Sequence, residues 1–349
     1  MSADLSLSYE RCVRTRSLAS SCRACVDACP VSAVTLEGPK QSVGVDLDAC
    51  TGCGLCQAAC PTEAIAVFDV RPLLGQATLA CGSDGLPCVG ALSVEDLLTA
   101  AQRTGALRLV GRACSGSHAQ VAARVEAARS FLAALGLGAT LEWTEEAPAA
   151  PPAPAPASAP PPPVPPRRQF LGIFVPRALP PEPRRLGFPA TLDVKRLREA
   201  TPPARRARLL AALPSSVAPK LATLAAADVP FTSSKEVDAA TCTGCSACVT
   251  ACPTGALTSS RLKDQLRFDG SRCVKCGLCH DVCEPRAITL APQHRVVDFL
   301  DFAPRALVTL KMVQCGECGA SFKDDGAAEV LCPRCREQAD EARALQGAR

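Results

Sequence analysis

Apolar residues between residues 70 and 146 occur in two patterns that alternate along the chain. The runs ATLACG and ALRLVGRAC are short and continuous, which is typical of buried strands. Apolar positions recur at helical spacing over Ser93–Arg103 and His118–Leu135, which predicts two helices. Ser93, with Asp96 three residues later, has the pattern of a capping box at a helix N-terminus. This alternation predicts a small α/β domain over residues 70–146.

The chain beyond this domain is dominated by proline. The stretch PAAPPAPAPASAPPPPVPP has eleven prolines in nineteen residues, and proline neither pairs within a sheet nor continues a helix. Residues 147–168 are therefore expected to form a semi-stiff linker, whose nineteen-residue proline-rich stretch can extend up to about 60 Å at about 3.1 Å per residue. We expect the two halves that it joins to tumble independently. Residues 169–230 predict a partly ordered segment with helices at 204–213 and 221–227.

One segment of the first half recurs in the second half. VDLDACTGCGLCQAACPTEAI, from Val45, aligns without gaps on VDAATCTGCSACVTACPTGAL, from Val237. The repeat predicts one module over residues 1–69 and a second over residues 231–295. Residues 296–349 remain as a C-terminal tail.

The composition favours a metalloprotein over a disulfide-bonded protein. Aromatic residues make up 3% of the 349 residues, too few for one large conventional core. The chain has 23 cysteines, but it shows no signal peptide and no apolar run long enough to cross a bilayer. Metal ligation in a reducing compartment is the better interpretation of these cysteines. We expect a cytoplasmic protein without a membrane span.

Metal binding by the cysteines would change the net charge of the protein. The formal charge of +4 counts every cysteine as a neutral thiol. Four iron–sulfur clusters held by sixteen thiolates, with one Zn²⁺ held by four more, would bring the charge to about −6. A nucleic-acid partner is therefore not expected, because its binding depends on a positive field and on aromatic side chains that stack on bases.

Two cysteine runs in the second half share the spacing C-x2-C-x2-C-x3-C. Three thiolates at i, i+3 and i+6 on a tight loop can wrap one face of a cubic iron–sulfur cluster, and the fourth cysteine lies beyond that face. Eight cysteines at these spacings are not explained by core packing. The runs are Cys242, Cys245, Cys248 and Cys252, followed by a proline, and Cys273, Cys276, Cys279 and Cys283.

These runs resemble the bacterial-type two-[4Fe-4S] ferredoxin family, in which the fourth cysteine of each run ligates the other cluster. The resemblance covers about 55 residues in each half and implies four [4Fe-4S] clusters. It implies an α+β fold of two ferredoxin-like modules, with the small α/β domain between them. Pro285 follows Cys283 one position later than the family pattern has it. In the second module the resemblance assigns one cluster to Cys242, Cys245, Cys248 and Cys283, and the other to Cys252, Cys273, Cys276 and Cys279.

The first module lacks one cysteine of the family pattern, because Ala19 stands where the first run needs a ligand. Cys12 lies upstream, and the nine residues between it and Cys22 can close a loop at modest entropic cost. We hypothesise that Cys12 is the displaced ligand. The alternatives are a three-iron cluster or a ligand from the α/β domain. The resemblance assigns one cluster to Cys29, Cys50, Cys53 and Cys56, and the hypothesis assigns the other to Cys12, Cys22, Cys25 and Cys60.

The tail carries two C-x2-C turns separated by thirteen residues. Such turns present four thiolates tetrahedrally, which suits a structural Zn²⁺ ion. The pattern resembles a zinc ribbon. A rubredoxin-type single iron and a disulfide-bonded or metal-free site are the alternatives. The four residues are Cys315, Cys318, Cys332 and Cys335.

Three cysteines of the α/β domain remain: Cys81, Cys88 and Cys114. The segments LPCVGALSVEDLL and GRACSGSHAQVAARVEAAR resemble iron–sulfur subunits found beside certain hydrogenases and disulfide reductases, whose α/β domain carries a [2Fe-2S] cluster. The resemblance implies a cluster or metal held by these cysteines with His118. The alternative is that they are small apolar residues of the strands. His280 and His294 show no ligand spacing and are expected at the surface.

The sequence favours electron transfer over catalysis. It contains no phosphate-binding glycine motif and no acid–base constellation outside the clusters. We therefore expect a non-catalytic electron-relay protein, a polyferredoxin, that serves a larger oxidoreductase. Its expected partners are redox proteins, for example a molybdenum- or hydrogenase-type catalytic subunit, by analogy. The alternative is a redox sensor or a metallocentre maturation factor.

Overall fold

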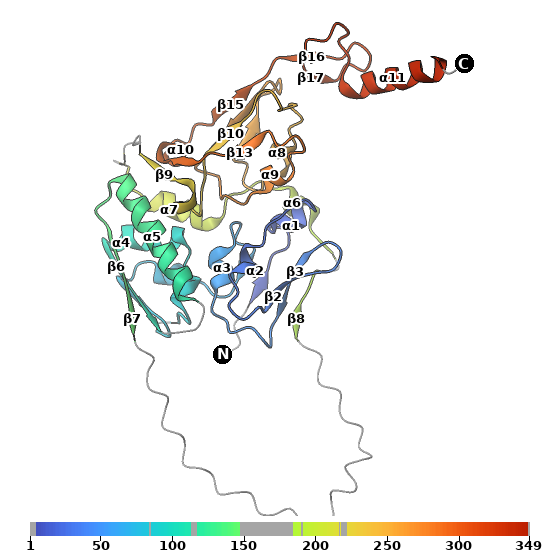
Figure 1. Cartoon of the computed structure of the whole chain (residues 1–349). Coiled ribbons are helices and arrows are strands. Elements are labelled where there is room, and N and C mark those ends of the chain that lie inside the picture. The colour runs from blue at the N-terminus through green and yellow to red at the C-terminus, as the bar shows by residue number, and fades with distance from the viewer. Residues whose placement is uncertain are drawn as a thin grey trace, which may run out of the picture.

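A computed structural model provides the structure and combines short helices with small sheets (Figure 1). The first module lies beside the α/β domain, and the second module covers both (Figure 1). The described residues are 5–83, 85–112, 117–146, 184–189, 191–215, 217 and 222–347.

The first module is built from two antiparallel strand pairs and three short helices. Its outer pair joins the two ends of the module, because β1 (Ser6–Leu7) pairs with β4 (Ile65–Ala66). Its inner pair, β2 (Val34–Glu37) with β3 (Ser42–Asp46), is extended by β8 (Arg185–Leu186). The helices are α1 (Val13–Arg16), α2 (Ala24–Asp27) and α3 (Leu55–Ala59).

The second module repeats this plan. β10 (Lys235–Val237) pairs with β13 (Ile288–Leu290), and β11 (Leu257–Ser259) pairs with β12 (Gln265–Phe268). A third strand, β15 (Arg305–Thr309), extends the inner pair as β8 does in the first module. The helices are α8 (Ala247–Ala251) and α9 (Leu278–Asp281).

Between the two modules in sequence lies a three-stranded parallel sheet with the order β5-β6-β7. Its helix α4 begins at the predicted capping box, in which Ser93 Oγ accepts from the Asp96 N–H and the Asp96 carboxylate accepts from the Ser93 N–H. Helix α5 has the predicted bounds. The elements are β5 (Thr78–Ala80), α4 (Val94–Thr104), β6 (Ala106–Arg112), α5 (His118–Leu135) and β7 (Thr140–Glu146), with 3-10 turns at Arg71–Leu73 and Val89–Ala91.

The segment before the second module contains one prediction that is wrong. In place of a helix at 221–227, the described residues form β9 (Thr223–Ala225) and a 3-10 turn (Ala226–Asp228). β9 pairs with β14 (Gln293–Arg295). The backbone hydrogen bonds of this pairing outweigh the local preference of residues 221–227 for a helix. Helix α6 (Val194–Arg198) is exposed and capped by Asp193, whose carboxylate accepts two backbone N–H groups.

Helix α7 (Ala204–Ala212) lies where the first module, the α/β domain and the second module meet (Figure 1). Glu63 of the first module caps its N-terminus, since its carboxylate accepts the N–H groups of Ala204 and Arg205 at 2.6 and 3.3 Å. Glu63 holds a φ of +51°, a region that favours glycine, and the equivalent residue of the second module is Gly255. The repeat therefore departs from glycine at the position where a side chain is needed to hold α7.

The expectation that the two halves tumble independently is wrong for this structure, because they share one hydrophobic core. Phe131 of α5 packs edge-on against Phe231 and against Phe299 of α10 (Val296–Leu300), with ring centroids 4.8 and 5.2 Å away. His294, expected at the surface, is fully buried and stacks on Phe131. Burial lowers its pKa to about 4. Three of the twelve aromatic residues of the chain thus pack together where the halves meet.

The C-terminal part of the tail forms a separate small unit at the end of the second module, whereas α10 and β15 of the tail pack with the rest of the molecule. β16 (Met312–Gln314) pairs with β17 (Ser321–Lys323), and α11 (Pro333–Gly347) points away from the rest of the molecule (Figure 1). Lys323 Nζ donates to the carbonyls of Ala239 and Ala240 at 2.6 and 2.7 Å, which attaches the hairpin to the module. Within the described ranges, no helix has both the length and the apolar character needed to cross a membrane.

The shared core generates a prediction about stability. Phe299→Ala should lower the free energy of unfolding by about 3–5 kcal/mol, because it removes a fully buried ring from the junction of the halves. Phe302→Ala is the matched control, since Phe302 is 64% exposed, and it should change stability by less than about 0.5 kcal/mol. Anaerobic denaturant unfolding measures both. Equal effects of the two substitutions would contradict a core shared between the halves.

Candidate metal centres

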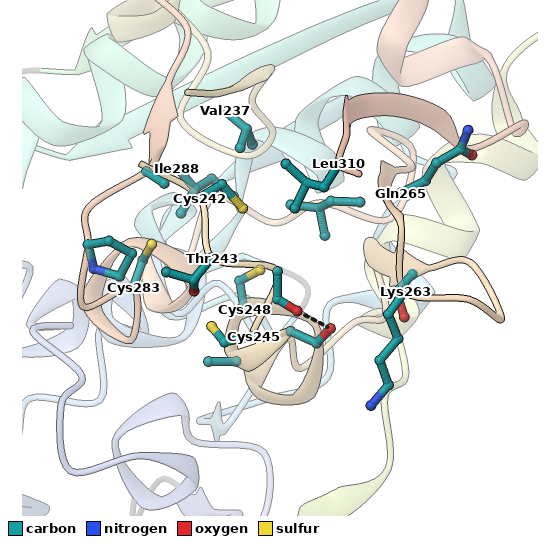
Figure 2. A pocket seen from close by; sticks show the side chains of 17 residues that line it. Val237, Cys242, Thr243, Cys245, Cys248, Lys263, Gln265, Cys283, Ile288 and Leu310 are labelled. Atoms are coloured by element: carbon teal, nitrogen blue, oxygen red, sulfur yellow. Dashed lines mark hydrogen bonds between the residues drawn. The ribbon is translucent and has the colours of Figure 1, made fainter. Parts of the chain in front are cut away.

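One cavity of the second module brings together the four cysteines that were assigned to its first cluster (Figure 2). Cys242 and Cys245 lie on the loop before α8, Cys248 lies on α8, and Cys283 follows α9. Much of the remaining wall is apolar and includes Val237, Ile288 and Leu310, while Lys263 and Gln265 add polar groups. Two residues of the loop, Gly244 and Ser246, adopt left-handed backbone angles, which turns the chain tightly between successive cysteines.

The electrostatics show why this set suits a cationic group. Burial, together with the nearby thiolates of Cys245, Cys242 and Cys283, raises the pKa of Cys248 to about 12. Four thiolates can therefore share this space only when positive charge lies among them. An iron–sulfur core supplies that charge, and the donor set fits it.

The second set of this module is also assembled. Burial, with contributions from Cys273 and Cys252 and against the effect of Lys235, raises the pKa of Cys279 to about 12. Burial likewise raises the pKa of Cys276, which also has Cys273 and Cys252 as neighbours. The Ser233 hydroxyl lies 3.3 Å from Cys273 Sγ, and the Thr254 hydroxyl lies 3.6 Å from Cys252 Sγ.

The first module has a corresponding set of four cysteines: Cys29, Cys50, Cys53 and Cys56. Burial raises the pKa of Cys56 to about 12, with further contributions from Cys53, Cys50 and Cys29. The Ala33 N–H donates to Cys29 Sγ at 3.2 Å, a bond that stabilises a thiolate. The loop that carries this set packs against the α/β domain.

A single glycine allows this close packing. A Cβ at Gly54, whose φ is +74°, would lie 2.5 Å from Cβ of Ala91 in the Val89–Ala91 turn. Only glycine fits both the backbone angle and this space.

Cys12 lies in the same cavity as Cys22, Cys25 and Cys60, which is where the displaced-ligand hypothesis needs it. The cavity walls are mostly apolar and include Leu7, Val43 and Ile65, with Arg14 and Thr62 as polar members. Burial raises the pKa of Cys12, and the charges of Cys60 and Cys22 raise it further. Ala19, at the position that the family pattern would fill with cysteine, is exposed.

The loop between Cys12 and Cys22 is held in place by Arg14. Its Nη1 donates to the Cys22 carbonyl at 2.7 Å, and its Nε donates to the Gln41 carbonyl at 2.8 Å. Within the described residues, the α/β-domain thiols Cys81 and Cys88 do not line this cavity. The geometry favours Cys12 over a ligand from that domain.

The four sulfurs of the tail lie within 4.8 Å of one another. Cys318 Sγ and Cys332 Sγ are 3.8 Å apart. A tetrahedral site with Zn–S bonds of about 2.3 Å has sulfurs about 3.8 Å apart, so the spacing fits a four-thiolate ion. Backbone N–H groups of Cys318 and Cys332 lower the pKa of Cys315 to about 6, whereas the neighbouring thiols of Cys318 and Cys332 raise that of Cys335 to about 12.

The remaining thiols of the α/β domain form a pair at the carboxyl end of the parallel strands. The Cys88 thiol and the Val89 N–H, at 3.3 Å, donate to Cys81, and together with Arg112 they lower its pKa to about 5. His118 is engaged at both ring nitrogens, with Nε2 2.7 Å from the Arg112 carbonyl and Nδ1 3.0 Å from Glu145. It is therefore not positioned to ligate a metal. Cys114 lies outside the described residues.

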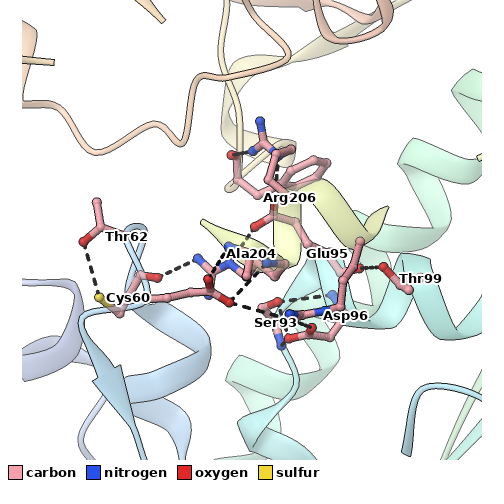
Figure 3. A network of polar contacts seen from close by, with 12 residues as sticks. Cys60, Thr62, Ser93, Glu95, Asp96, Thr99, Ala204 and Arg206 are labelled. Carbon is pink, nitrogen blue, oxygen red and sulfur yellow. Dashed lines mark hydrogen bonds and ion pairs between the residues drawn. The ribbon is translucent and has the colours of Figure 1, made fainter. Parts of the chain in front are cut away.

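Sequence reasoning missed a buried charge network at the centre of the molecule (Figure 3). Glu95 of α4 accepts from Arg205 Nε at 2.7 Å and from Arg206 Nε at 2.6 Å. Arg205 Nη2 also donates to the Cys60 carbonyl at 2.6 Å, and Arg206 Nη1 donates to the Cys273 carbonyl at 2.8 Å. The run ARRARLLAA contains these arginines, but nothing in it indicates partners more than sixty residues away.

His280, also expected at the surface, is half-buried beside a cation. Its Nε2 lies 2.8 Å from Lys235 Nζ. Burial and, to a smaller extent, the Lys235 charge together lower the pKa of His280 to about 4. His280 is therefore neutral at physiological pH.

The geometry around Cys12 generates a second prediction. Cys12→Ala should remove about one iron from one cluster, or the whole cluster, because three thiolates remain in that cavity. Cys81→Ala, which also removes a buried thiol but lies outside the four sets, should leave the iron and sulfide content unchanged. Anaerobic iron and sulfide analysis with electron paramagnetic resonance (EPR) compares the two variants. Full retention of every cluster in Cys12→Ala would refute the hypothesis.

The tail generates a third prediction. Cys332→Ala should lose the metal of the C-terminal site and keep its iron–sulfur content, because the site is formed by this hairpin and helix alone. Elemental analysis after dialysis against a chelator measures both quantities. Loss of iron in place of another metal would identify a rubredoxin-type site.

Comparison with known protein families identifies two segments of the chain. The model of a 4Fe-4S dicluster domain matches residues 20–64, and a second model of the same description matches residues 241–288. These segments contain fifteen of the sixteen cysteines of the four sets, and Cys12 lies outside them. A comparison with curated proteins found no match. The chain therefore contains two 4Fe-4S dicluster ferredoxin domains and is an iron–sulfur protein of the electron-transfer type.

Proposed function

We propose that this protein is an electron-relay subunit, a polyferredoxin, of a larger oxidoreductase and that it holds four [4Fe-4S] clusters. The observation that carries the proposal is that fifteen of the sixteen cysteines lie in the two dicluster domains and that Cys12 shares a cavity with Cys22, Cys25 and Cys60. The proposed ligand sets are Cys29, Cys50, Cys53 and Cys56; Cys12, Cys22, Cys25 and Cys60; Cys252, Cys273, Cys276 and Cys279; and Cys242, Cys245, Cys248 and Cys283.

A bound [4Fe-4S] cluster supplies reversible one-electron chemistry. The protein contributes a fixed arrangement of thiolates, apolar walls that limit contact with water, and hydrogen bonds to sulfur. The N–H of Ala64 donates to Cys60 Sγ at 3.2 Å, the counterpart of the bond from Ala33 to Cys29. These contacts hold the ligands in one geometry, which keeps the structural change on electron transfer small.

Other proteins must supply and accept the electrons. The sequence has no nucleotide-binding glycine motif, and the cavities around Cys12 and around Cys242 are lined mainly by cysteines and apolar residues, with a few polar side chains such as Arg14 and Lys263. A molybdenum- or hydrogenase-type catalytic subunit is the proposed partner, on the analogy stated above.

The Cys315–Cys335 site is proposed to hold a structural Zn²⁺ ion. All four sulfurs are contributed by one hairpin and the start of α11, so no open coordination position is required. The hairpin is anchored on the second module through Lys323, which places the zinc unit at one end of the molecule.

The alternative of a redox sensor or maturation factor requires a loosely held cluster. The loop after Cys12 was the best candidate for such a ligand, but Arg14 ties it to two backbone carbonyls. This rigid attachment favours a relay.

A redox titration tests the proposal. The anaerobically purified protein, followed by EPR, should show four clusters that are each reduced and reoxidised reversibly, with spin coupling within each domain. Clusters that disassemble on oxidation, or that transfer to a metal-free acceptor protein, would overturn the relay and support the alternative.

A further inference from the structure

We propose that the two dicluster domains form one continuous four-site relay and that the buried triad Glu95, Arg205 and Arg206 sets the potentials of its two inner sites. This inference rests on the proposed function. The inner sites are the Cys12 set, which contains Cys60, and the Cys273 set, which contains Cys276.

The inner sites face each other across the contact between the domains. Cys22 and Cys276 line the same cavity, although they belong to different domains. Next to it, the Ser21 N–H and hydroxyl donate to the two carboxylate oxygens of Asp281 at 2.8 and 2.9 Å. Burial lowers the pKa of Arg16 in the first domain. The charges of Cys252 and Cys276, in the second domain, are near enough to oppose that shift.

The triad connects the backbones of the two inner sets through one carboxylate (Figure 3). Each oxygen of Glu95 accepts from one arginine, and each arginine also donates to the carbonyl of an inner-set cysteine, Cys60 or Cys273. Arg206 has two further acceptors, the carbonyls of Ser271 and Phe231, both at 2.6 Å. The path from Cys60 to Cys273 therefore crosses only three side chains.

Burial makes these charges effective. The side chains of Glu95 and Arg206 are 1% exposed and that of Arg205 is 6% exposed. Arginine stays protonated at any physiological pH, so the triad carries two positive charges and one negative charge beside the inner sites. Positive charge favours the reduced form of a nearby cluster, and Glu95 limits that effect. The triad donates to no cysteine of the outer sets among the described contacts.

This arrangement assigns an order to the relay. The outer set with Cys53 and the outer set with Cys245 form its ends, and the inner sets form its middle. An electron lost by one inner site is gained by the other, so the exchange consumes no further reactant. Electrons that enter at either end would collect in the middle, where the triad raises the potential.

Three substitutions test the inference. Glu95→Gln should raise the potentials of two clusters together, one in each domain, because it removes the negative charge shared by the inner sites. Arg206→Lys should lower the potential of the inner cluster of the second domain, because lysine cannot reach Glu95 and the carbonyls at once. Arg208→Lys is the matched control on the same helix. Arg208 pairs with Asp96 and Glu63 and, among the described contacts, donates to no cysteine, so all four potentials should stay unchanged.

The potentials are measured by EPR-monitored titration of the full chain, after iron and sulfide analysis and circular dichroism of each variant. Retention of four clusters in Glu95→Gln with a shift of only one potential, of none, or of all four equally would overturn the inference. If Glu95→Gln does not fold, Arg206→Lys decides: an unchanged inner potential overturns the inference. A parent protein whose clusters do not cycle reversibly would instead overturn the proposed function.

Discussion

Four thiolates cannot be buried side by side without positive charge among them, and this constraint governs most of the molecule. In each of the four cluster sets, burial and the charges of neighbouring thiolates raise the pKa of at least one member: Cys248, Cys279, Cys56 or Cys12. The short strands and one-turn helices around them bury few apolar residues. Folding of each domain is therefore expected to be coupled to metal binding, as in other small domains whose ligands lie close together.

The same chain uses a second means of holding its parts together, which does not depend on metal. Glu95, Arg205 and Arg206 are desolvated where the α/β domain and the two dicluster domains meet. A buried ion pair adds little net stability but makes alternative arrangements costly, because any other docking leaves a charge unpaired. The phenylalanine core nearby supplies apolar stabilisation, and the triad supplies the unique fit.

Local features could be predicted from the sequence, and contacts between distant segments could not. The bounds of α5 and the capping box at Ser93 depend on neighbouring residues, and the cysteine spacing reflects one loop at a time. Cys12 could be proposed as a ligand only by elimination, because no spacing rule connects it to Cys22. The burial of His294, the strand at Thr223–Ala225 and the partners of Arg205 each depend on residues far away in the sequence. Single-sequence patterns contain no signal for such contacts.

The position of α7 has a consequence for biosynthesis. The ribosome synthesises the first dicluster domain and the α/β domain before residues 204–212. Glu63 and Glu95 therefore lack their partners on α7 until that helix has been made. The proline-rich stretch delays the arrival of α7, yet a long connection adds little to the entropic cost of its return. During that interval the Cys60 carbonyl lacks its Arg205 donor, and the residues of the second half that line a cavity with Cys22 are not yet in place. The order of synthesis thus separates the folding of the first dicluster domain from its docking on the second.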